Sequence, residues 1–293
     1  MATEQPKGQD YEEKKTIGGF SVYSAIDPFK TSIALILNGD MQKHGEIALH
    51  SCTLESGDHV HSFSSIGSIK KQNQDRLVVY PDHSFVFLAD GYGSYGDLIA
   101  NSIALYCLEH PTKSLRNIAT ESQRKLNEVA PDLERKTDNA GKEKQKGGIG
   151  CGFIRIEKNE METKKILNYL RIGDVNIAVL RGGKVVLRTI DQTLEQKMLK
   201  EGVSTEVAKN SANVLVNAIS ADNDDLECDE PQNFELEKGD KVLIGCDGVM
   251  KERSDQELEE AISKKNPKEM TWWLCEKGYA GYDNITAAVI DIT

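Results

Sequence analysis

The sequence predicts an α+β protein in which β-sheets pack together and helices cover them from outside. Two observations lead to this prediction. At least eight short runs rich in β-branched and aromatic residues are separated by turn residues, and the helical stretches between them come in pairs. An apolar content of 39% is ordinary for a globular protein with a real core. We expect one domain over residues 61–293, preceded by a tail and extension of unknown role over residues 1–60.

In the first half of the chain, the strand-like runs give way to two helical stretches. The predicted strands are residues 20–24, 33–37, 46–51, 62–66, 76–80 and 84–89. Residues 97–109 change period and place Ile99, Ile103 and Cys107 on one helical face. Apolar residues recur at three- and four-residue steps over 115–129, which predicts a second helix. The lysine-rich residues 134–146 have no apolar period and are predicted to be an exposed connector.

The second half is predicted to contain four more strands, then a helix, then another strand, two helices and a final strand. The strands are residues 149–156, 166–172, 176–181, 184–189, 241–246 and 285–292, and Gly182-Gly183 predicts a hairpin turn between the third and fourth. Residues 192–203 look helical, and the acidic residues 222–240 look irregular. Ser254 followed by Glu257 is a capping box that starts one helix, and Pro267 starts the next.

Composition excludes several classes of protein. The longest apolar runs have the length of strands, and the chain starts without an apolar signal core, so we expect a cytoplasmic protein that does not bind membranes. The six cysteines are scattered, without a C-x-x-C pair, which fits a reducing compartment. A net charge of −11 argues against nucleic acid as a partner and suits a protein that binds cations. We expect a monomer.

Three aspartates share one local setting. Asp90 and Asp247 each follow an apolar strand and precede a glycine, and Asp283 directly precedes the last strand. Such positions place a carboxylate where a rigid strand meets a loop. Three converging carboxylates need a cation to offset their repulsion, and hard oxygen ligands suit Mg²⁺ or Mn²⁺. An Asp-Gly pair is also a common turn signal, so position alone leaves a turn and a metal site both open.

A set of motifs resembles the metal-dependent serine/threonine protein phosphatases of type 2C, the PPM family. Their order and spacing match that family from about residue 62 onward. The matching segments are residues 67–76 (GSIKKQNQDR), 89–93 (ADGYG), 171–174 (RIGD), 246–249 (CDGV) and 283–286 (DNIT). The resemblance implies an αββα sandwich, that is, two mainly antiparallel sheets flanked by pairs of helices. It also implies hydrolysis of phosphoserine and phosphothreonine in proteins.

Carried over residue by residue, the resemblance implies a site with two or three Mn²⁺ or Mg²⁺ ions. Asp90 bridges two ions, the Gly91 carbonyl binds the second, and Asp247 and Asp283 complete the first. Asp174 helps to hold a third, weaker ion. A hydroxide activated between two cations then attacks phosphorus, so no nucleophilic side chain is needed. A phosphorylated protein is the implied substrate.

Three positions depart from the pattern of many family members. Lys70 stands where an arginine often grips phosphate, and it lacks the bidentate geometry of arginine. Gln74 replaces a glutamate and can reach a metal only through water. Tyr92 stands where a histidine protonates the leaving group, and an unperturbed tyrosine is a poor acid at neutral pH, although it can donate a hydrogen bond.

These departures keep an alternative open: a catalytically weak or silent relative that acts as a binding or regulatory module. A hydrolase acting on small phosphorylated metabolites is a third hypothesis. A zinc site at His59 and His61, which share one face of a strand, lacks a third ligand at an obvious spacing, so a surface strand is expected there.

Overall fold

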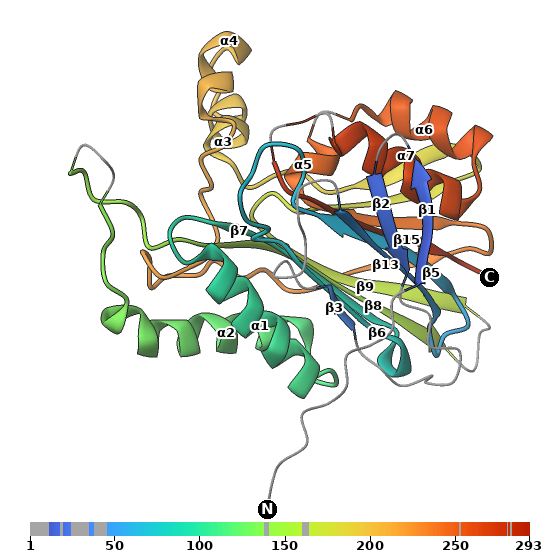
Figure 1. Ribbon diagram of the computed structural model, residues 1–293, viewed down its shortest axis with the longest axis horizontal. Helices are drawn as coiled ribbons and strands as arrows, with labels where there is room; N and C mark the ends of the chain where they lie inside the picture. The colour runs from blue at the N-terminus through green and yellow to red at the C-terminus, as the bar shows by residue number, and fades with distance from the viewer. Residues whose placement is uncertain are drawn as a thin grey trace, which may run out of the picture.

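The computed structural model describes residues 12–17, 20–24, 35–37, 46–137, 141–159, 164–251, 253–279, 281 and 283–293. Its strands form two sheets that pack face to face, as the fold prediction requires (Figure 1). Sheet A has the order β1 (Glu12–Ile17), β2 (Phe20–Ser24), β4 (Glu46–Thr53), β5 (His59–Ser65), β15 (Ile285–Asp291), β14 (Lys241–Gly245), β10 (Asn176–Arg181) and β11 (Lys184–Arg188).

Sheet B follows the same antiparallel pattern. Its order is β13 (Gln232–Leu236), β9 (Lys164–Ile172), β8 (Gly148–Asn159), β7 (Phe85–Tyr92), β6 (Arg76–Tyr80) and β3 (Leu35–Leu37), with the short β12 (Ile219–Ser220) paired to β8. Among the pairings between described strands, only β2 with β4 is parallel. The expectation of two mainly antiparallel sheets is therefore confirmed.

Helices cover the outer faces in pairs. On sheet B lie α1 (Gly96–Glu109) and α2 (Leu115–Val129), and on sheet A lie α6 (Asp255–Lys264) and α7 (Pro267–Tyr279) (Figure 1). The short remaining helices are α3 (Leu194–Lys200), α4 (Thr205–Ala208), α5 (Asp247–Met250), η2 (Pro81–His83), η3 (Ala130–Asp132) and η4 (Lys209–Ser211). Among the described helices, none combines the length and the apolar character that crossing a bilayer requires.

The buried apolar residues form two clusters, one that includes the space between the sheets and one between sheet B and its helices. Between the sheets, Leu88 and Ile244 are fully buried, and Ile244 points toward Gly152 of β8. Between sheet B and its helices, the rings of Phe87 and Phe153 lie 4.9 Å apart. Burial of apolar surface on both faces is what holds such a sandwich together.

Capping chemistry sets the helix starts that the sequence predicts. The Ser254 hydroxyl accepts a hydrogen bond from the Glu257 N–H at 3.2 Å, and the Glu257 carboxylate accepts one from the Ser254 N–H at 2.9 Å. The capping box is therefore confirmed. Ser114 caps α2 in the simpler way, by accepting from the Asn117 N–H.

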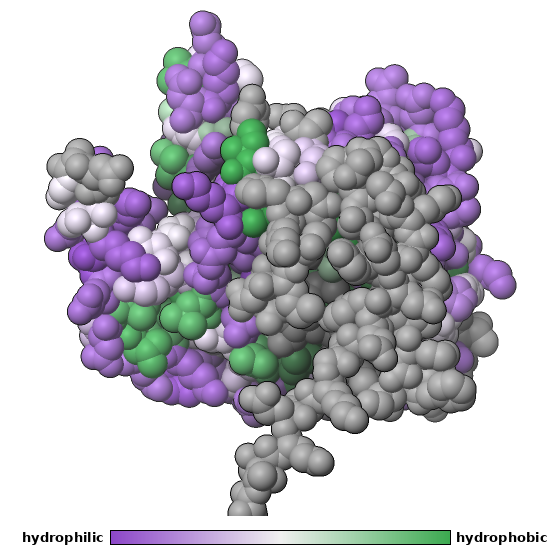
Figure 2. Space-filling view, in the orientation of Figure 1, coloured by the Kyte–Doolittle hydropathy of each residue, from purple (hydrophilic) through white to green (hydrophobic). Residues whose placement is uncertain are grey.

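The predicted helix over residues 192–203 is shorter in the structure. Thr193 is its N-cap, so α3 begins at residue 194 and leaves Gln192 to pair with a neighbouring segment. Gly202, with φ of +85°, ends this turn, and α4 and η4 follow. We call residues 194–211 the flap, which projects from the body beside the two layers (Figure 1). The space-filling view shows polar and apolar side chains mixed over it (Figure 2).

Two other segments differ from expectation. Residues 222–240, predicted to be irregular, contain the edge strand β13, whose alternation of polar and apolar residues fits a half-exposed position beside β9. The boundary expected near residue 60 falls inside β5. The strands β1, β2 and β4 before it belong to sheet A, and β3 belongs to sheet B. The N-terminal extension therefore adds strands to both sheets. Residues 33 and 34 of one predicted strand lie outside the described residues.

Candidate active site

Five aspartates lie at one end of the sandwich because of the way the strands are paired. Asp90 is near the end of β7, and its antiparallel neighbour β6 begins directly after Asp75. In the same way, Asp247 follows β14, and the neighbouring β15 begins just after Asp283. Asp174 lies in the turn that takes the chain from β9 of sheet B to β10 of sheet A. The topology therefore gathers these carboxylates at one sheet end.

A pocket of about 430 Å³ opens at this end. All eight residues that the sequence singled out for the site line this pocket: Lys70, Gln74, Asp90, Gly91, Tyr92, Asp174, Asp247 and Asp283. Residues 213–215, which follow the flap, form another part of the wall. The pocket is thus bounded by both sheets and by the base of the flap.

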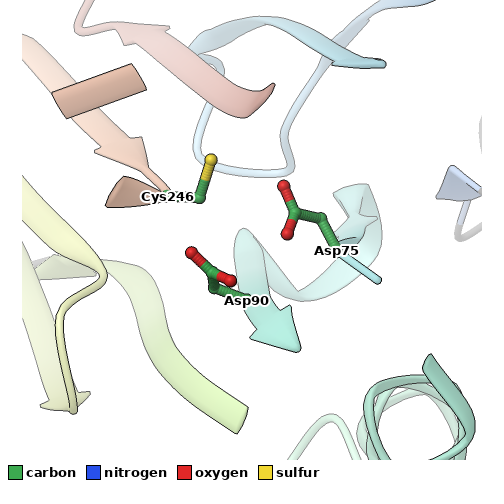
Figure 3. A group of neighbouring side chains, drawn as sticks. All are labelled: Asp75, Asp90 and Cys246. Carbon is green, nitrogen blue, oxygen red and sulfur yellow. The ribbon is translucent and has the colours of Figure 1, made fainter. Parts of the chain in front are cut away.

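The buried Asp75 and the partly exposed Asp90 form the floor of the site. Their carboxylates face each other from the start of β6 and the end of β7 (Figure 3). Asp75 is 1% exposed, and neither of its carboxylate oxygens has a well-formed hydrogen bond to the described residues, although the adjacent Thr286 and Cys246 side chains favour its charged form. Burial raises the pKa of Asp75 to about 7. Burial, followed by the charges of Asp247 and Asp75, raises the pKa of Asp90 well above its usual value.

The remaining aspartates add to this concentration of negative charge. The backbone N–H of Asp247 donates to Asp90 Oδ2 at 3.4 Å, which places Asp247 next to the floor. Burial raises the pKa of Asp247, and Asp283 adds to the rise. Asp174 is 8% exposed, and burial with help from Asp247 raises its pKa to about 7. The pKa values of Asp75, Asp90, Asp174 and Asp247 are therefore raised first by burial and further by neighbouring carboxylates.

Two glycines allow the backbones around the acids to approach closely. A Cβ on Gly150 of β8 would lie 2.7 Å from Asp174 Oδ1, and Gly150 is also the strand partner of Asp90. A Cβ on Gly248 would lie 2.1 Å from the carbonyl oxygen of Asn284. Neither position has room for a side chain, so both glycines are needed for this arrangement.

The loop before β6 is held by local and long-range hydrogen bonds. Asn73 Oδ1 accepts from the Asp75 N–H at 3.0 Å, an Asx turn that directs the chain into the strand. The buried Asn284 amide accepts from the Gln74 N–H at 2.9 Å and donates to the carbonyls of Ile66 and Gln72, each at 3.0 Å. Asn284 thereby fastens the Asp75 loop to the start of β15.

Lys70 lies beside Asp283 in the pocket. Its Nζ is 2.6 Å from Asp283 Oδ1, and both side chains are 39% exposed. Burial alone would lower the pKa of Lys70, but the hydrogen bond and charge of Asp283, with Asp90 and Asp247 beyond, raise it. The ammonium group is therefore charged and faces the aspartates.

Gln74 and Tyr92 have partners within the protein. Gln74 Nε2 donates to the Gly93 carbonyl at 3.1 Å, which ties the loop before β6 to the loop after β7. The Tyr92 hydroxyl lies over Gly148, in the direction of Ser220 on β12. Burial raises the pKa of Tyr92, although the Ser220 hydroxyl opposes the rise. Tyr92 is therefore a neutral phenol that can donate a hydrogen bond.

Cys246 lies within 4.8 Å of the Asp75 and Asp90 oxygens (Figure 3). Its Sγ accepts from the Thr286 N–H at 3.2 Å and donates to the Asn284 carbonyl at 3.5 Å. Burial raises the pKa of this thiol well above its usual value, which disfavours the thiolate that a metal ligand requires. Cys246 is therefore a packing residue, and the carboxylates are the candidate ligands.

The donor set fits hard divalent cations. Carboxylate oxygens and the Gly91 carbonyl are the ligands that Mg²⁺ and Mn²⁺ prefer. The unpartnered oxygens of Asp75 and the mutual repulsion of the five aspartates are both relieved by bound positive charge. His59 and His61 belong to a different region: their Nδ1 atoms are hydrogen-bonded to the Thr53 and Ser51 hydroxyls on β4.

Two residues of the site were not given a role from sequence. Asp75 lies within the residue 67–76 motif and directly precedes β6, much as Asp283 lies just before β15. This repeated position before a strand was an available signal. Lys251 lies one helical turn after Asp247 and reaches the same carboxylate. That pair is local in sequence, but the contacts of Lys251 with Ala212 and Asn213 depend on the position of the flap base, which no local pattern reveals.

Comparison with known proteins finds phosphatases that resemble this chain. No family model matches the chain. The protein phosphatase PhpP of Streptococcus pneumoniae is 24% identical over 242 residues, which are 78% of this chain and 95% of PhpP. The PPM Ser-Thr phosphatase MsPP of Mycobacterium smegmatis, solved with cacodylate, has a TM-score of 0.62 and 18% identity over 83% of this chain and 100% of MsPP.

The catalytic domain of the serine/threonine protein phosphatase PstP, solved with two manganese ions, has a TM-score of 0.62 and 22% identity over 80% of this chain and 98% of that domain. At these identities the solved structures establish the fold, and the curated relative extends the likeness to sequence over most of both chains. The chain therefore has the fold of the PPM serine/threonine protein phosphatases, and it resembles PhpP in sequence over most of both chains.

Proposed function

We propose that this chain hydrolyses phosphoserine and phosphothreonine in proteins, with two divalent cations bound in the aspartate pocket. The observation that carries the proposal is the convergence of Asp75, Asp90, Asp174, Asp247 and Asp283, whose pocket has far more negative than positive charge. Carboxylates gathered in this way without enough cationic partners are a feature of metal sites.

The positions of these residues support the proposed ligand roles. Asp90 with the Gly91 carbonyl, together with Asp247 and Asp283, would hold the two ions, and Asp75 supplies further oxygen atoms beside Asp90. When bound, Mn²⁺ or Mg²⁺ supplies an activated water for attack on phosphorus and neutralises charge on the phosphoryl oxygens. Manganese in the PstP structure supports this choice of metal.

The other pocket residues position the ester. Lys70 offers an ammonium group to the phosphoryl oxygens at the mouth, next to Asp283. Gln74 holds the two loops of the floor together through Gly93, so it fixes where Asp90 and its neighbours lie. Tyr92, kept neutral by its raised pKa, donates a hydrogen bond toward the leaving group. The reducing cytoplasm remains the expected location.

The test is turnover with and without metal. We expect the purified protein to cleave p-nitrophenyl phosphate and phosphothreonine peptides when manganese is present, and to stop when a chelator is added. Asp247→Asn should lower kcat by about 100-fold or more. Asp291→Asn is the matched control, because Asp291 lies at the opposite end of β15 and pairs with Lys241. Manganese-loaded protein without turnover on any phosphopeptide would overturn the proposal.

A catalytically silent relative is the second candidate, and one observation favours it. The Lys70 ammonium lies 2.6 Å from Asp283, where it could stand in for a metal ion. Calorimetry with manganese distinguishes the two candidates, since a silent module of this kind takes up little or no metal, whereas the enzyme binds two ions. Faster turnover of small phosphate esters than of phosphopeptides would instead point to a metabolite phosphatase.

A further inference from the structure

Lys251 connects two parts of the pocket that are far apart in sequence. It follows α5 and lies one helical turn after Asp247, and its Nζ is 3.9 Å from Asp247 Oδ2. The same Nζ donates to the Ala212 carbonyl at 3.1 Å and to the Asn213 side chain. The Lys251 side chain is 26% exposed, so these contacts are partly shielded from water.

The segment that Lys251 holds is the base of the flap. Residues 192–194 pair with residues 214–216 through the Leu194 N–H to the Val214 carbonyl at 2.7 Å and the Val216 N–H to the Gln192 carbonyl at 2.9 Å. Asn213 and its neighbours line the aspartate pocket on one side. On the other side lies a second cavity of about 640 Å³, lined by Gln192 and Val216 among others. With open space on both sides, the flap base depends on contacts such as Lys251 for its position.

Lys251 brings a positive charge to the side of the pocket that Asp174 and Asp247 share. Its Nζ lies 3.9 Å from Asp247 Oδ2, and Asp174 and Asp247 both line the pocket. A further divalent cation beside Asp174 would have to share this space with a fixed ammonium group. Like charges in a partly buried site repel strongly, so Lys251 disfavours an additional ion there.

We propose that Lys251 is a built-in cation of the aspartate pocket, which takes the place of a third metal ion on the Asp174–Asp247 side and ties the flap base to the pocket floor. Lys251 is therefore a positioning residue. The ion count rests on the proposed function, whereas the flap contact is a property of the metal-free protein and can be tested without it.

The first experiment counts bound manganese by calorimetry and by electron paramagnetic resonance. We expect two ions in the wild type, and the same number in Asp174→Asn. Lys251→Met, which keeps the apolar stem and removes the charge, should gain a weaker third ion that is lost again when Asp174→Asn is added. Lys251→Arg should bind two. A third ion in the wild type that disappears with Asp174→Asn would overturn the proposal, as would an unchanged count in Lys251→Met.

The second experiment measures cleavage of the flap by a glutamate-specific protease in the presence of chelator. The flap contains Glu195, Glu201 and Glu206, and the substitutions leave these sites intact. Lys251→Met should be cut about fivefold faster than wild type, as expected for loss of a contact worth about 1 kcal/mol. Lys251→Arg should be cut at the wild-type rate. Equal rates in all three proteins would overturn the flap contact.

Controls separate the inference from folding and from the proposed function. Lys241→Met removes a lysine at the opposite end of the sheet and should change neither readout. Should Lys251→Met fail to fold by circular dichroism, Lys251→Gln keeps a donor for Ala212 without the charge and decides the ion count. A wild type that binds no manganese would contradict the proposed function, and the cleavage rates alone would then support or overturn the role of Lys251.

Discussion

Asp75→Asn should stabilise the metal-free protein at alkaline pH, although it removes a residue of the site. Asp75 is 1% exposed, and burial raises its pKa from a usual value of 3.8 to about 7. A carboxyl with a raised folded-state pKa does not destabilise the fold below the unfolded value, and stability is lost as pH rises from the unfolded value through the folded value. Each pKa unit corresponds to about 1.4 kcal/mol, so the loss above pH 7 is about 4 kcal/mol.

The assay is urea unfolding in chelator at pH 4 and pH 8. Wild type and Asp75→Asn should be similar at pH 4, and the variant should be more stable by up to about 4 kcal/mol at pH 8. Added manganese should reverse the order, because ligand at 100 times its Kd stabilises wild type by about 2.7 kcal/mol and the variant binds it less well.

A buried aspartate that does have a cationic partner provides the matched control. Asp58 is fully buried and lies 2.6 Å from Lys165 Nζ, whose side chain is 12% exposed. Asp58→Asn should destabilise the fold by about 3 kcal/mol whether or not metal is present. If Asp75→Asn were as stable as or less stable than wild type at pH 8 without metal, the view that Asp75 is an uncompensated buried charge would be wrong.

Three further substitutions test how the site is supported. Asn284→Ala should destabilise the protein by about 3 kcal/mol in urea unfolding, because three hydrogen bonds to buried backbone groups are lost, including that from Gln74. Gly91→Ala should lower manganese affinity about tenfold by calorimetry, since its Cβ would lie 2.6 Å from the Gln74 carbonyl oxygen. Arg181→Ala should cost about 3 kcal/mol in thermal or urea unfolding without affecting metal binding, because it leaves Asp240, 1% exposed, without its bidentate partner. Unchanged stability in Asn284→Ala or Arg181→Ala, or unchanged manganese affinity in Gly91→Ala, would contradict the corresponding prediction.

Much of the fold could be predicted because strands and helices here follow local patterns. The period change after residue 96 and the capping box at Ser254 each depend on neighbouring residues only, and both agree with the structure. The flap could not be predicted in the same way, because Thr193 and the pairing of Gln192 decide where α3 begins. The sheet neighbours of the first 60 residues were equally invisible, since strand pairing joins distant segments.

The residues of the site also differ in how far local sequence could predict them. Asp90, Asp247 and Asp283 could be found because each stands beside a glycine or an asparagine at a strand end, and the family pattern gave them an order. The importance of Asp75 depends on its burial and on oxygens without partners, which only the packed structure shows. That of Lys251 depends on contact with residues nearly forty positions earlier in the chain.

The pairing of the N-terminal strands has a consequence for solubility. β2 lies against β4 and β3 lies against β6, so strands from the first 45 residues cover one edge of each sheet. A protein shortened to begin at residue 46 would present two bare strand edges, each with unpaired N–H and C=O groups that can pair with another molecule. Such a truncated protein should self-associate in a concentration-dependent way, even though every residue of the pocket is still present.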